Sequence, residues 1–446
     1  MKDVVDRLRE TSDDERRRHV VEVLEREFSE AAAESPGQFR LRFRKMARGP
    51  WDFYRGSACL FYDDVARAED PFVDERTSRV WIQGDLHGEN FGTYMNSRGR
   101  LVLDVNDFDE AYLGHWTWDL ARLAASVVVL GVGKAFSDDD LRGCVDAYVR
   151  AYGRQVRDFV AGNDDQEFAL KLDGATGAVR DVLRKARTST RVDQLRERTA
   201  VDGVQRRLLD VEGSTRHLDD EEHARVIEAY ERYLETIPER KRRTEVAYEL
   251  KDVVSAWGFG VDSVGLRSYN LLVEGQTEAL ENDVVLTVKQ GQRPALQRVV
   301  EDPRLDEAFV HQGHRTVVSR RALQNHTDPW AGHCELDGGG WAVTELSPYD
   351  HDLEWDDVDE PDQAVDVLRQ LGRATAKIHC VGDQASEQSL VDFSVEHAVA
   401  EVCDGGDGED QLVDALTTFA LAYGQQVRDD HRLFVDAFRS GEVADL

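Results

Sequence analysis

The spacing of hydrophobic residues along the chain predicts helices near both ends and strands in two separate regions. Apolar positions recur at helical intervals in four segments: residues 14–33, 141–159, 365–378 and 412–423. A fifth segment, Leu120–Val132, is almost wholly apolar and predicts a buried helix. Short runs rich in β-branched residues predict strands on either side of residue 90 and a second group of strands over residues 269–345. This mixture predicts a fold of the α+β class.

Two stretches rich in charge lack a strong pattern of this kind. Residues 163–245 combine many charged residues with helix formers, and we interpret them as solvated helices. Residues 350–359 are mainly acidic, and we interpret them as a solvated loop. A chain of 446 residues can bury more than one core, so we expect two lobes with flanking helical segments. The changes in pattern predict four regions: residues 1–78, 79–250, 251–350 and 351–446.

The charge balance excludes some classes of partner. The formal net charge is −32, from 88 acidic and 56 basic residues, and only nine of the basic residues are lysine. Nucleic acids and anionic membranes need a basic surface, so neither is an expected partner. A surface that is acidic and poor in lysine is typical of proteins adapted to high salt, where screening reduces the repulsion between like charges. An ordinary acidic protein is the alternative interpretation.

The five cysteines give no sign of a disulfide framework or of a zinc site. They stand at positions 59, 144, 334, 380 and 403, with no CxxC pair and no regular spacing. The first 19 residues are charged and lack an apolar core, and no run is long enough to span a membrane. We therefore expect a protein of the reducing cytoplasm.

Candidate chemistry gathers in Gln83–Gly92 and Leu101–Ala111. The order strand, polar loop, turn, strand, polar loop would bring Asp85, Asn90, Asp107 and Asp109 to one end of a hairpin. Carboxylate and amide oxygens suit Mg²⁺, which takes one or two carboxylates and completes its shell with phosphate and water. The sequence therefore predicts a magnesium-dependent phosphotransfer site, although Asp, Asn and Gly also build ordinary surface turns.

A second group of residues predicts a nucleotide-binding hairpin. Glycines 258, 260 and 265 precede a strand, a turn and a second strand that ends at Lys289. Backbone amides around Gly260, Ser263 and Gly265 can approach phosphate closely, and Lys289 can reach the same phosphates. Asp262 places a negative charge in this loop. Residues 294–324 should contain the acidic partner of Lys289, and Glu301 and Glu307 are both candidates.

The segment 39–56 is basic and aromatic in an otherwise acidic chain. It could hold phosphate through Arg55 or Lys45, or it could pair with acidic neighbours, and the sequence leaves both interpretations open.

The first of these motifs resembles the catalytic and metal loops of aminoglycoside and choline kinase-like phosphotransferases, members of the protein-kinase-like fold. The matching residues are Gly84-Asp-Leu-His-x-x-Asn90 and Asn106-Asp-Phe-Asp109, followed by Asp119-Leu-Ala121. The resemblance implies that Asp85 orients or deprotonates an acceptor hydroxyl and that Asn90 and Asp107 hold Mg²⁺. Asp109 would bind a second metal or cap the loop. Asp119 would be a structural cap, and His87 would act catalytically or brace the loop.

The order of the motifs implies a circular permutation. In the kinase-like group, a helix similar to Leu371–His379 comes immediately before the catalytic loop, whereas here it lies near the C-terminus. The glycine-rich loop, the Lys289 strand and a last strand ending at Glu345 precede that helix in the usual order. The resemblance implies a two-lobed fold in which Glu345 borders the nucleotide at a hinge. Permutation is tolerated when both new termini lie in exposed connections.

The same motifs identify the chain as a member of domain of unknown function 2252, an uncharacterised prokaryotic family. The resemblance covers residues 45–383 and is carried by five motifs: Lys45–Gly56, Gly84–Gly92, Asn106–Glu110, Gly260–Gly265 and Ala376–Asp383. It brings no substrate.

Three functions are consistent with these residues. The leading hypothesis is an enzyme that transfers the γ-phosphate of ATP, with Mg²⁺, to an unidentified small hydroxylated acceptor. The second is a nucleotide-binding regulator or pseudokinase, which Asp262 and the acidic linker favour. The third is a nucleotidyltransferase that moves AMP on the same fold. The sequence does not indicate an oligomeric state.

Overall fold

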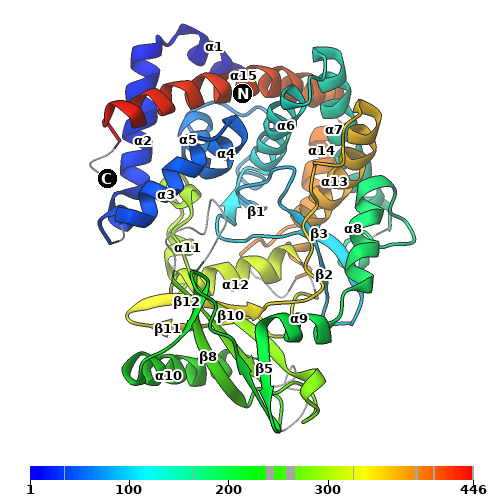
Figure 1. The fold of residues 1–446 in the computed structure, drawn as a ribbon. Helices are drawn as coiled ribbons and strands as arrows, with labels where there is room; N and C mark the ends of the chain where they lie inside the picture. The colour runs from blue at the N-terminus through cyan, green and yellow to red at the C-terminus, as the bar shows by residue number, and fades with distance from the viewer. Residues whose placement is uncertain are drawn as a thin grey trace.

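A computed structural model describes residues 1–34, 36–162, 164–237, 246–257, 267–324, 326–386, 390–404 and 407–443. A helical body forms the upper part of the molecule in Figure 1, and a sheet with its own helices forms the lower part. This arrangement confirms the α+β class.

The helical body is assembled from both ends of the chain. Its helices are α1 (Lys2–Glu10), α2 (Asp13–Glu34), α3 (Pro36–Met46), α4 (Pro50–Gly56), α5 (Ala58–Val65), α6 (Trp116–Gly133), α7 (Asp138–Gly162), α8 (Gly177–Thr188), α13 (Pro361–Val381), α14 (Val395–Asp404) and α15 (Gly408–Ser440). The predicted apolar run is helix α6, which is buried along almost its whole length. One hydrophobic core joins these helices, from Val4 to Val443.

A buried ion network fastens the last helix to the first ones. The guanidinium of Arg16 on α2 contacts Asp64 on α5 at 2.6 Å and Asp430 on α15 at 2.6 Å. All three side chains are nearly inaccessible to solvent. Buried charges are tolerated when they are paired in this way, so the network fixes how the two ends of the chain meet.

Two short antiparallel pairs lie within the helical body. Strand β1 (Val80–Ile82) pairs with β4 (Tyr112–Gly114), and β2 (Phe91–Met95) pairs with β3 (Leu101–Val105). In the β2–β3 hairpin Phe91 is opposite Val105, so the segments after β1 and after β3 meet at one end, as the sequence predicted.

The lower part is built on a six-stranded antiparallel sheet. Its strands are β7 (Thr215–His217), β8 (Leu250–Trp257), β9 (Arg267–Val273), β10 (Val284–Gln290), β11 (Gly332–Leu336) and β12 (Gly339–Glu345). The strand order is β11-β12-β10-β9-β8-β7. The hairpin β9–β10 and the strand that ends at Glu345 agree with the sequence patterns.

The two faces of this sheet have different neighbours. Helix α10 (Asp220–Thr236) packs through Tyr233 on the face that contains Leu286. Helix α12 (Gln312–Leu323) packs through Val317 on Ala342. Ala342 is opposite Lys289 in the sheet, and side chains alternate along a strand, so α12 and Lys289 share the second face.

Residues 163–245 are not purely helical, so this part of the sequence interpretation was wrong. Besides α8, α9 (Arg191–Arg198) and α10, the described residues contain β7 and a hairpin of β5 (Thr199–Asp202) and β6 (Gln205–Leu208). Most side chains of this hairpin are exposed, so its strands show no apolar alternation. Leu208 and Leu195 nevertheless pack on Val285 of the sheet.

The acidic linker after β12 is also not simply solvated. Its apolar residues Leu353, Trp355 and Val358 are buried against the helical body. The backbone runs alongside β2, where Leu353 N–H donates to Phe91 O at 2.8 Å and Thr93 N–H donates to His351 O at 2.9 Å. The linker therefore places the sheet next to the β2–β3 hairpin.

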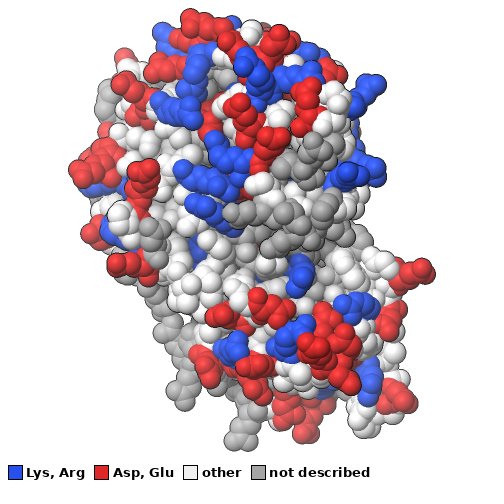
Figure 2. All heavy atoms as spheres, turned by 90° about the vertical axis from the view of Figure 1, so that its left-hand side faces the viewer, with Lys and Arg blue, Asp and Glu red and all other residues white. Residues whose placement is uncertain are grey.

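Surface charge and membrane character follow the composition. On the face in Figure 2, the basic and acidic side chains of the described residues are interspersed and form no continuous basic surface. Among the described helices, none combines the length and the apolar character that crossing a membrane requires.

The start of α10 gives a small stability prediction. The carboxylate of Asp219 caps this helix by accepting the Glu222 N–H at 2.9 Å. Asp219→Ala should lower the free energy of unfolding by about 1 kcal/mol, because one helix N–H loses its acceptor. Urea unfolding measures this, with Glu231→Ala at an exposed site of the same helix as the control. Equal losses in both variants would contradict the role of the cap.

Candidate functional site

The loop after β1 is held by a buried carboxylate. Asp119 on α6 accepts the N–H groups of Gln83 at 2.7 Å and Gly84 at 3.0 Å, and it is fully buried. Gly84 has φ +83°, and a Cβ there would lie 2.1 Å from the carbonyl oxygen of Glu110. Only glycine fits this position. The backbone before Asp85 is therefore fixed from two sides.

Asp85 is oriented by a buried arginine. The Nε of Arg122 donates to Asp85 Oδ1 at 2.7 Å, and its Nη2 contacts the same oxygen. Arg122 is inaccessible to solvent, and its guanidinium lies over the ring of Tyr54 at 4.4 Å. The second oxygen, Oδ2, lies 3.9 Å from His87 Nε2. Burial, with help from nearby arginines, holds the pKa of His87 well below its usual range, so this imidazole is neutral.

Two amide side chains connect the first polar loop to the second. Gln83 accepts the Asp85 N–H through Oε1 at 2.8 Å and donates through Nε2 to Asp107 O at 2.6 Å. Asn90 donates from its side-chain Nδ2 to Asp85 O at 2.9 Å, and its backbone carbonyl accepts the Asn106 N–H at 3.1 Å. The structure thus brings Asp85, Asn90 and Asp107 into one hydrogen-bonded group.

Asp107 has a backbone conformation that few non-glycine residues adopt, although aspartate tolerates it better than most. Its φ is +50°, in the left-handed region, and its Oδ1 accepts the Asp109 N–H at 3.2 Å. Non-glycine residues with such backbone angles cluster at functional sites. The side chain is exposed.

Lys289 reaches this acidic loop from the sheet. Its Nζ lies 2.5 Å from Asp109 Oδ2, so residues that are 180 positions apart form an ion pair. The sequence pattern predicts the acidic partner of Lys289 between residues 294 and 324. The ion pair that the structure records is instead with Asp109, and Glu301 and Glu307 are exposed. The Lys289 hairpin and the acidic loop after β3 therefore lie against each other.

An arginine that sequence reasoning missed holds the second loop in place. Arg315 on α12 is buried, and it donates to the carbonyl oxygens of Asp109 at 2.6 Å and Ala111 at 2.6 Å. It also donates to Gln292 O at 3.1 Å, just beyond strand β10. One side chain thus joins the loop of the helical body to the Lys289 strand. Helix α12 has almost no amphipathic pattern, so no signal in the sequence singled out Arg315.

The linker and the basic-aromatic segment close one side of the group. Trp355 Nε1 donates to Gly88 O at 2.8 Å, and Asn106 Nδ2 donates to Asp352 Oδ1 at 2.6 Å. Arg55 on α4 pairs with Glu89 at 2.8 Å. Of the two roles considered for Arg55, the structure shows pairing with an acidic neighbour.

The remaining nucleotide-binding candidates are three loop residues and Glu345. Gly260, Ser263 and Gly265 lie outside the described residues. Glu345 stands at the end of β12, where its carboxylate pairs with Arg191 of α9 at 2.7 Å and its N–H donates to Asp328 at 2.8 Å. Glu345 is opposite Leu286 in the sheet, so its side chain begins on the face away from Lys289.

The late helix α13 supports the early loop from behind. His379 Nε2 lies 3.3 Å from Asp119 Oδ2, and its Nδ1 lies 3.0 Å from the hydroxyl of Tyr152. Lys377 pairs with Asp104 on β3. Helix α13, which contains the sequence motif Leu371–His379, therefore contacts α6 through Asp119 and β3 through Asp104.

The oxygen atoms of Asp107 and Asn90 suit a magnesium ion whose other ligands are phosphate and water. Among the described residues, no group of three or more His, Cys, Asp and Glu side chains is arranged to hold a metal. Mg²⁺ needs only one or two carboxylates from a protein when phosphates and water supply the rest. Asp107 is an exposed carboxylate, and the N–H of its neighbour Asn106 donates to the backbone carbonyl of Asn90. One carboxylate and one amide side chain therefore come from two bonded loops and fit that requirement, while Asp109 is engaged by Lys289.

Comparison with known proteins places the chain in a family. The model of "Uncharacterized protein conserved in bacteria (DUF2252)" matches residues 34–437. The chain belongs to the DUF2252 family. No curated protein matches it, and no solved structure does. The matched range of this DUF2252 protein includes every described site residue above.

One further carboxyl group of this DUF2252 protein is electrostatically unusual. Burial, reinforced by the carboxylates of Glu27 and Asp85, raises the pKa of Glu110 to about 8. Its Oε2 accepts the Ala295 N–H at 2.6 Å. Glu110 is thus protonated at neutral pH and lies behind the Asp85 loop.

This raised pKa predicts a pH dependence of stability. The folded state holds the Glu110 proton up to a pH of about 8, whereas the unfolded state releases it near 4.3, so stability should fall as pH rises across that window. Glu110→Gln keeps the acceptor oxygen without the titration and should flatten this fall. Urea unfolding between those limits measures it, with exposed Glu301→Gln as the control. Parallel curves for the natural protein and Glu110→Gln would contradict the assignment.

Proposed function

We propose that this protein transfers the γ-phosphate of ATP, with Mg²⁺, to a small hydroxylated acceptor. The observation that carries the proposal is the ion pair between Lys289 and Asp109, which joins the two candidate motifs in one group. Lys289 is on β10. Counted from β8, this is the third strand in chain order, and the two strands before it, β8 and β9, flank residues 258–266. Protein kinases carry their phosphate-binding lysine on an equivalent third strand, after the strands joined by the glycine-rich loop.

Each residue would have a defined task in the transfer. Asp85, oriented by Arg122, would accept the proton of the acceptor hydroxyl while the hydroxyl oxygen bonds to the γ-phosphorus and the bond to the β-phosphate oxygen breaks. Lys289 would leave Asp109 and bind the phosphates of ATP. Asp107 and Asn90 would hold Mg²⁺, which neutralises charge on the phosphates. ADP and the phosphorylated acceptor are the products.

The fold is proposed to be a circularly permuted kinase-like one. Two contacts support this. Helix α13 supports the loop of Asp85 through His379 and Asp119, although His379 comes 260 residues after Asp119 in the chain. Helix α12 follows the Lys289 strand and packs on the same face of the sheet, as the helix after the lysine strand does in kinases.

One departure favours a second candidate function. The kinase helix in this position provides a glutamate to the lysine, whereas α12 provides Arg315 to the acidic loop, and Asp109 neutralises Lys289. A protein that binds nucleotide without turnover would tolerate this change. We therefore keep a nucleotide-binding regulator as the alternative. We also propose that the protein works in the cytoplasm and tolerates high salt.

Labelled ATP tests the proposal. The full chain is incubated with Mg²⁺, a panel of hydroxylated small molecules and ATP labelled at either the γ- or the α-phosphate, at physiological and at molar KCl. The proposal expects γ-label to appear in one class of acceptor together with ADP. Transfer of α-label would indicate a nucleotidyltransferase, and binding without transfer would indicate a regulator. If neither binding nor transfer occurs at physiological or at molar KCl, the proposal is contradicted.

A further inference from the structure

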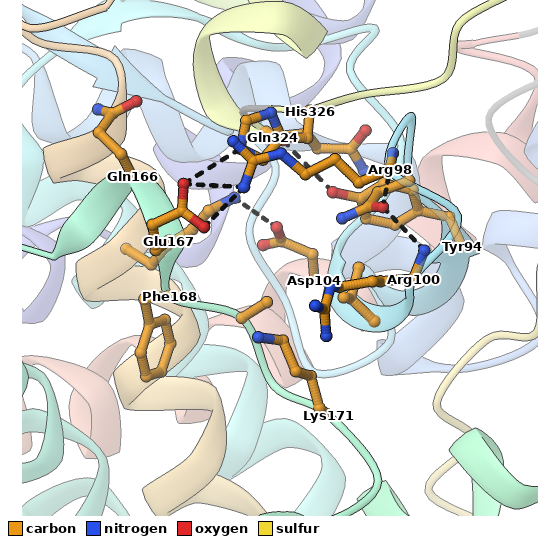
Figure 3. A pocket seen from close by; sticks show the side chains of 14 residues that line it. Tyr94, Arg98, Arg100, Asp104, Gln166, Glu167, Phe168, Lys171, Gln324 and His326 are labelled. Carbon is orange, nitrogen blue, oxygen red and sulfur yellow. Dashed lines mark hydrogen bonds and ion pairs between the residues drawn. The ribbon is translucent and has the colours of Figure 1, made fainter.

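A separate cavity lies along one side of the β2–β3 hairpin and its turn. It has a volume of about 270 Å³ and is lined by β2, β3, residues 166–171, residues after α12, and Lys377 of α13. Figure 3 shows the side chains that surround it. Of the described residues, those that line the cavity extend from the turn at residues 96–100 along Val102 and Asp104 of β3, and Asp85, Asn90, Asp107 and Lys289 are not among them. The cavity is therefore distinct from the candidate site.

The charged side chains of this cavity are mainly basic, in a chain that is strongly acidic overall. Four cations, Arg98, Arg100, Lys171 and Lys377, line it with two carboxylates. Both carboxylates are already matched. Glu167 accepts two hydrogen bonds from Arg98 Nη1, at 2.8 and 2.6 Å, and Asp104 pairs with Lys377. Two positive charges remain after this pairing.

These two charges belong to Arg100 and Lys171. Within the described part of the chain, neither side chain has a recorded hydrogen bond or ion pair, and both line the same cavity (Figure 3). A guanidinium presents a planar fork of donors, and an ammonium presents a compact charge. Together they suit a ligand with two or more anionic oxygens.

A buried lysine provides the inner wall. Lys377 is 4% exposed, and its Nζ donates to Asp104 and to Leu323 O at 2.7 Å. An ammonium has three N–H donors, so one remains for a ligand. Its charge is compensated by Asp104, so this lysine needs no ligand to be tolerated in the interior. The cavity thus has a preformed polar wall and unpaired cations at its opening.

From these contacts we propose that the cavity binds a small anion through a phosphate or carboxylate group. Arg100 and Lys171 would hold the anionic oxygens, and Lys377 would donate from the interior. The volume accommodates a compact molecule only. A ligand there would touch β3, the strand that leads to Asp107.

Titration calorimetry with two probes tests the proposal and separates the two chemistries. The full chain is titrated at low ionic strength with inorganic phosphate and, separately, with the dicarboxylate malonate. At least one probe should bind, and the double variant Arg100→Ala with Lys171→Ala should weaken its binding tenfold or more. Both side chains are at least partly exposed, so the fold should persist, as unchanged urea unfolding would confirm.

Two controls separate this site from general charge effects and from the candidate nucleotide site. Arg180→Ala with Arg187→Ala removes the same charge from exposed positions on α8 and should leave probe binding unchanged. Lys289→Met should also leave it unchanged. The proposal is overturned if neither probe binds the natural protein, or if binding persists in the Arg100 and Lys171 variant. Equal loss in the α8 control would overturn it too.

Discussion

Asp85→Asn is expected to lower γ-phosphate transfer by about 10³-fold, the range found when a group that moves a proton is removed. The asparagine side chain has nearly the same shape and retains an oxygen toward Arg122, but it cannot accept the proton of an acceptor hydroxyl. Transfer from γ-labelled ATP, to water or to the acceptor found in the panel, provides the measurement. Asp357→Asn removes a carboxylate from an exposed position of the linker and should leave the rate unchanged.

A loss of folding must be separated from this loss of chemistry. Arg122 is fully buried, so Asp85→Asn leaves its charge without its carboxylate partner and should also reduce stability. The double variant Asp85→Asn with Arg122→Gln removes both charges. It should unfold at a higher urea concentration than Asp85→Asn alone, yet remain inactive. Recovery of transfer in the double variant, or a rate within about tenfold of the natural one in Asp85→Asn, would contradict the role of Asp85.

Arg315→Leu is expected to destabilise the protein by about 3 kcal/mol or more. Buried Arg315 donates to backbone carbonyls on the acidic loop and beyond β10, and each carbonyl left without a donor costs about 1–3 kcal/mol. The side chain also joins the loop to the Lys289 strand, so Mg²⁺-dependent ATP affinity should fall as well. Urea unfolding measures the first effect and calorimetry the second.

A surface arginine provides the comparison for this prediction. Arg304 on α11 (Pro303–Ala308) is 59% exposed and pairs with Asp302, so Arg304→Leu should change stability by less than about 1 kcal/mol. A similar small effect of Arg315→Leu would show that the loop does not depend on the clamp.

The parts of the site that the sequence predicted are those with short-range patterns. The strands on either side of Asn90 and Asp107 follow from β-branched runs between polar loops, and the hairpin before Lys289 follows from the same signal. The mixed α+β class followed in the same way. Local periodicity is sufficient for such elements because their hydrogen bonds join neighbouring segments.

The features that the sequence did not predict depend on contacts between distant segments. The sequence predicts the acidic partner of Lys289 in the helices that follow it, whereas Asp109 comes from the other half of the chain. Arg315 is on a helix whose apolar and polar residues do not separate into two faces, so the sequence does not indicate that this arginine is buried. No local pattern encodes such pairs, because burial is decided by the docking of one lobe on the other.

Two errors have local causes. The β5–β6 hairpin has mostly exposed side chains, so its strands lack alternation of buried apolar and exposed polar residues, and Asp202-Gly203 is the turn signal that indicates it. In the linker, the acidic residues obscured Leu353 and Trp355, which are spaced two apart as in a strand with one buried face.

If the Lys289 hairpin and the acidic hairpin form one site for Mg²⁺ and ATP, substitutions in either hairpin should weaken the binding of the same ligand. Calorimetric titration of the full chain with ATP, with and without Mg²⁺, measures this when Asp107→Asn and Lys289→Met are titrated alongside the natural protein. We expect Mg²⁺-dependent binding to the natural protein, loss of that dependence in Asp107→Asn, and at least about tenfold weaker binding in Lys289→Met. Undiminished, Mg²⁺-dependent affinity in both variants, or no ATP binding to the natural protein, would contradict a shared site.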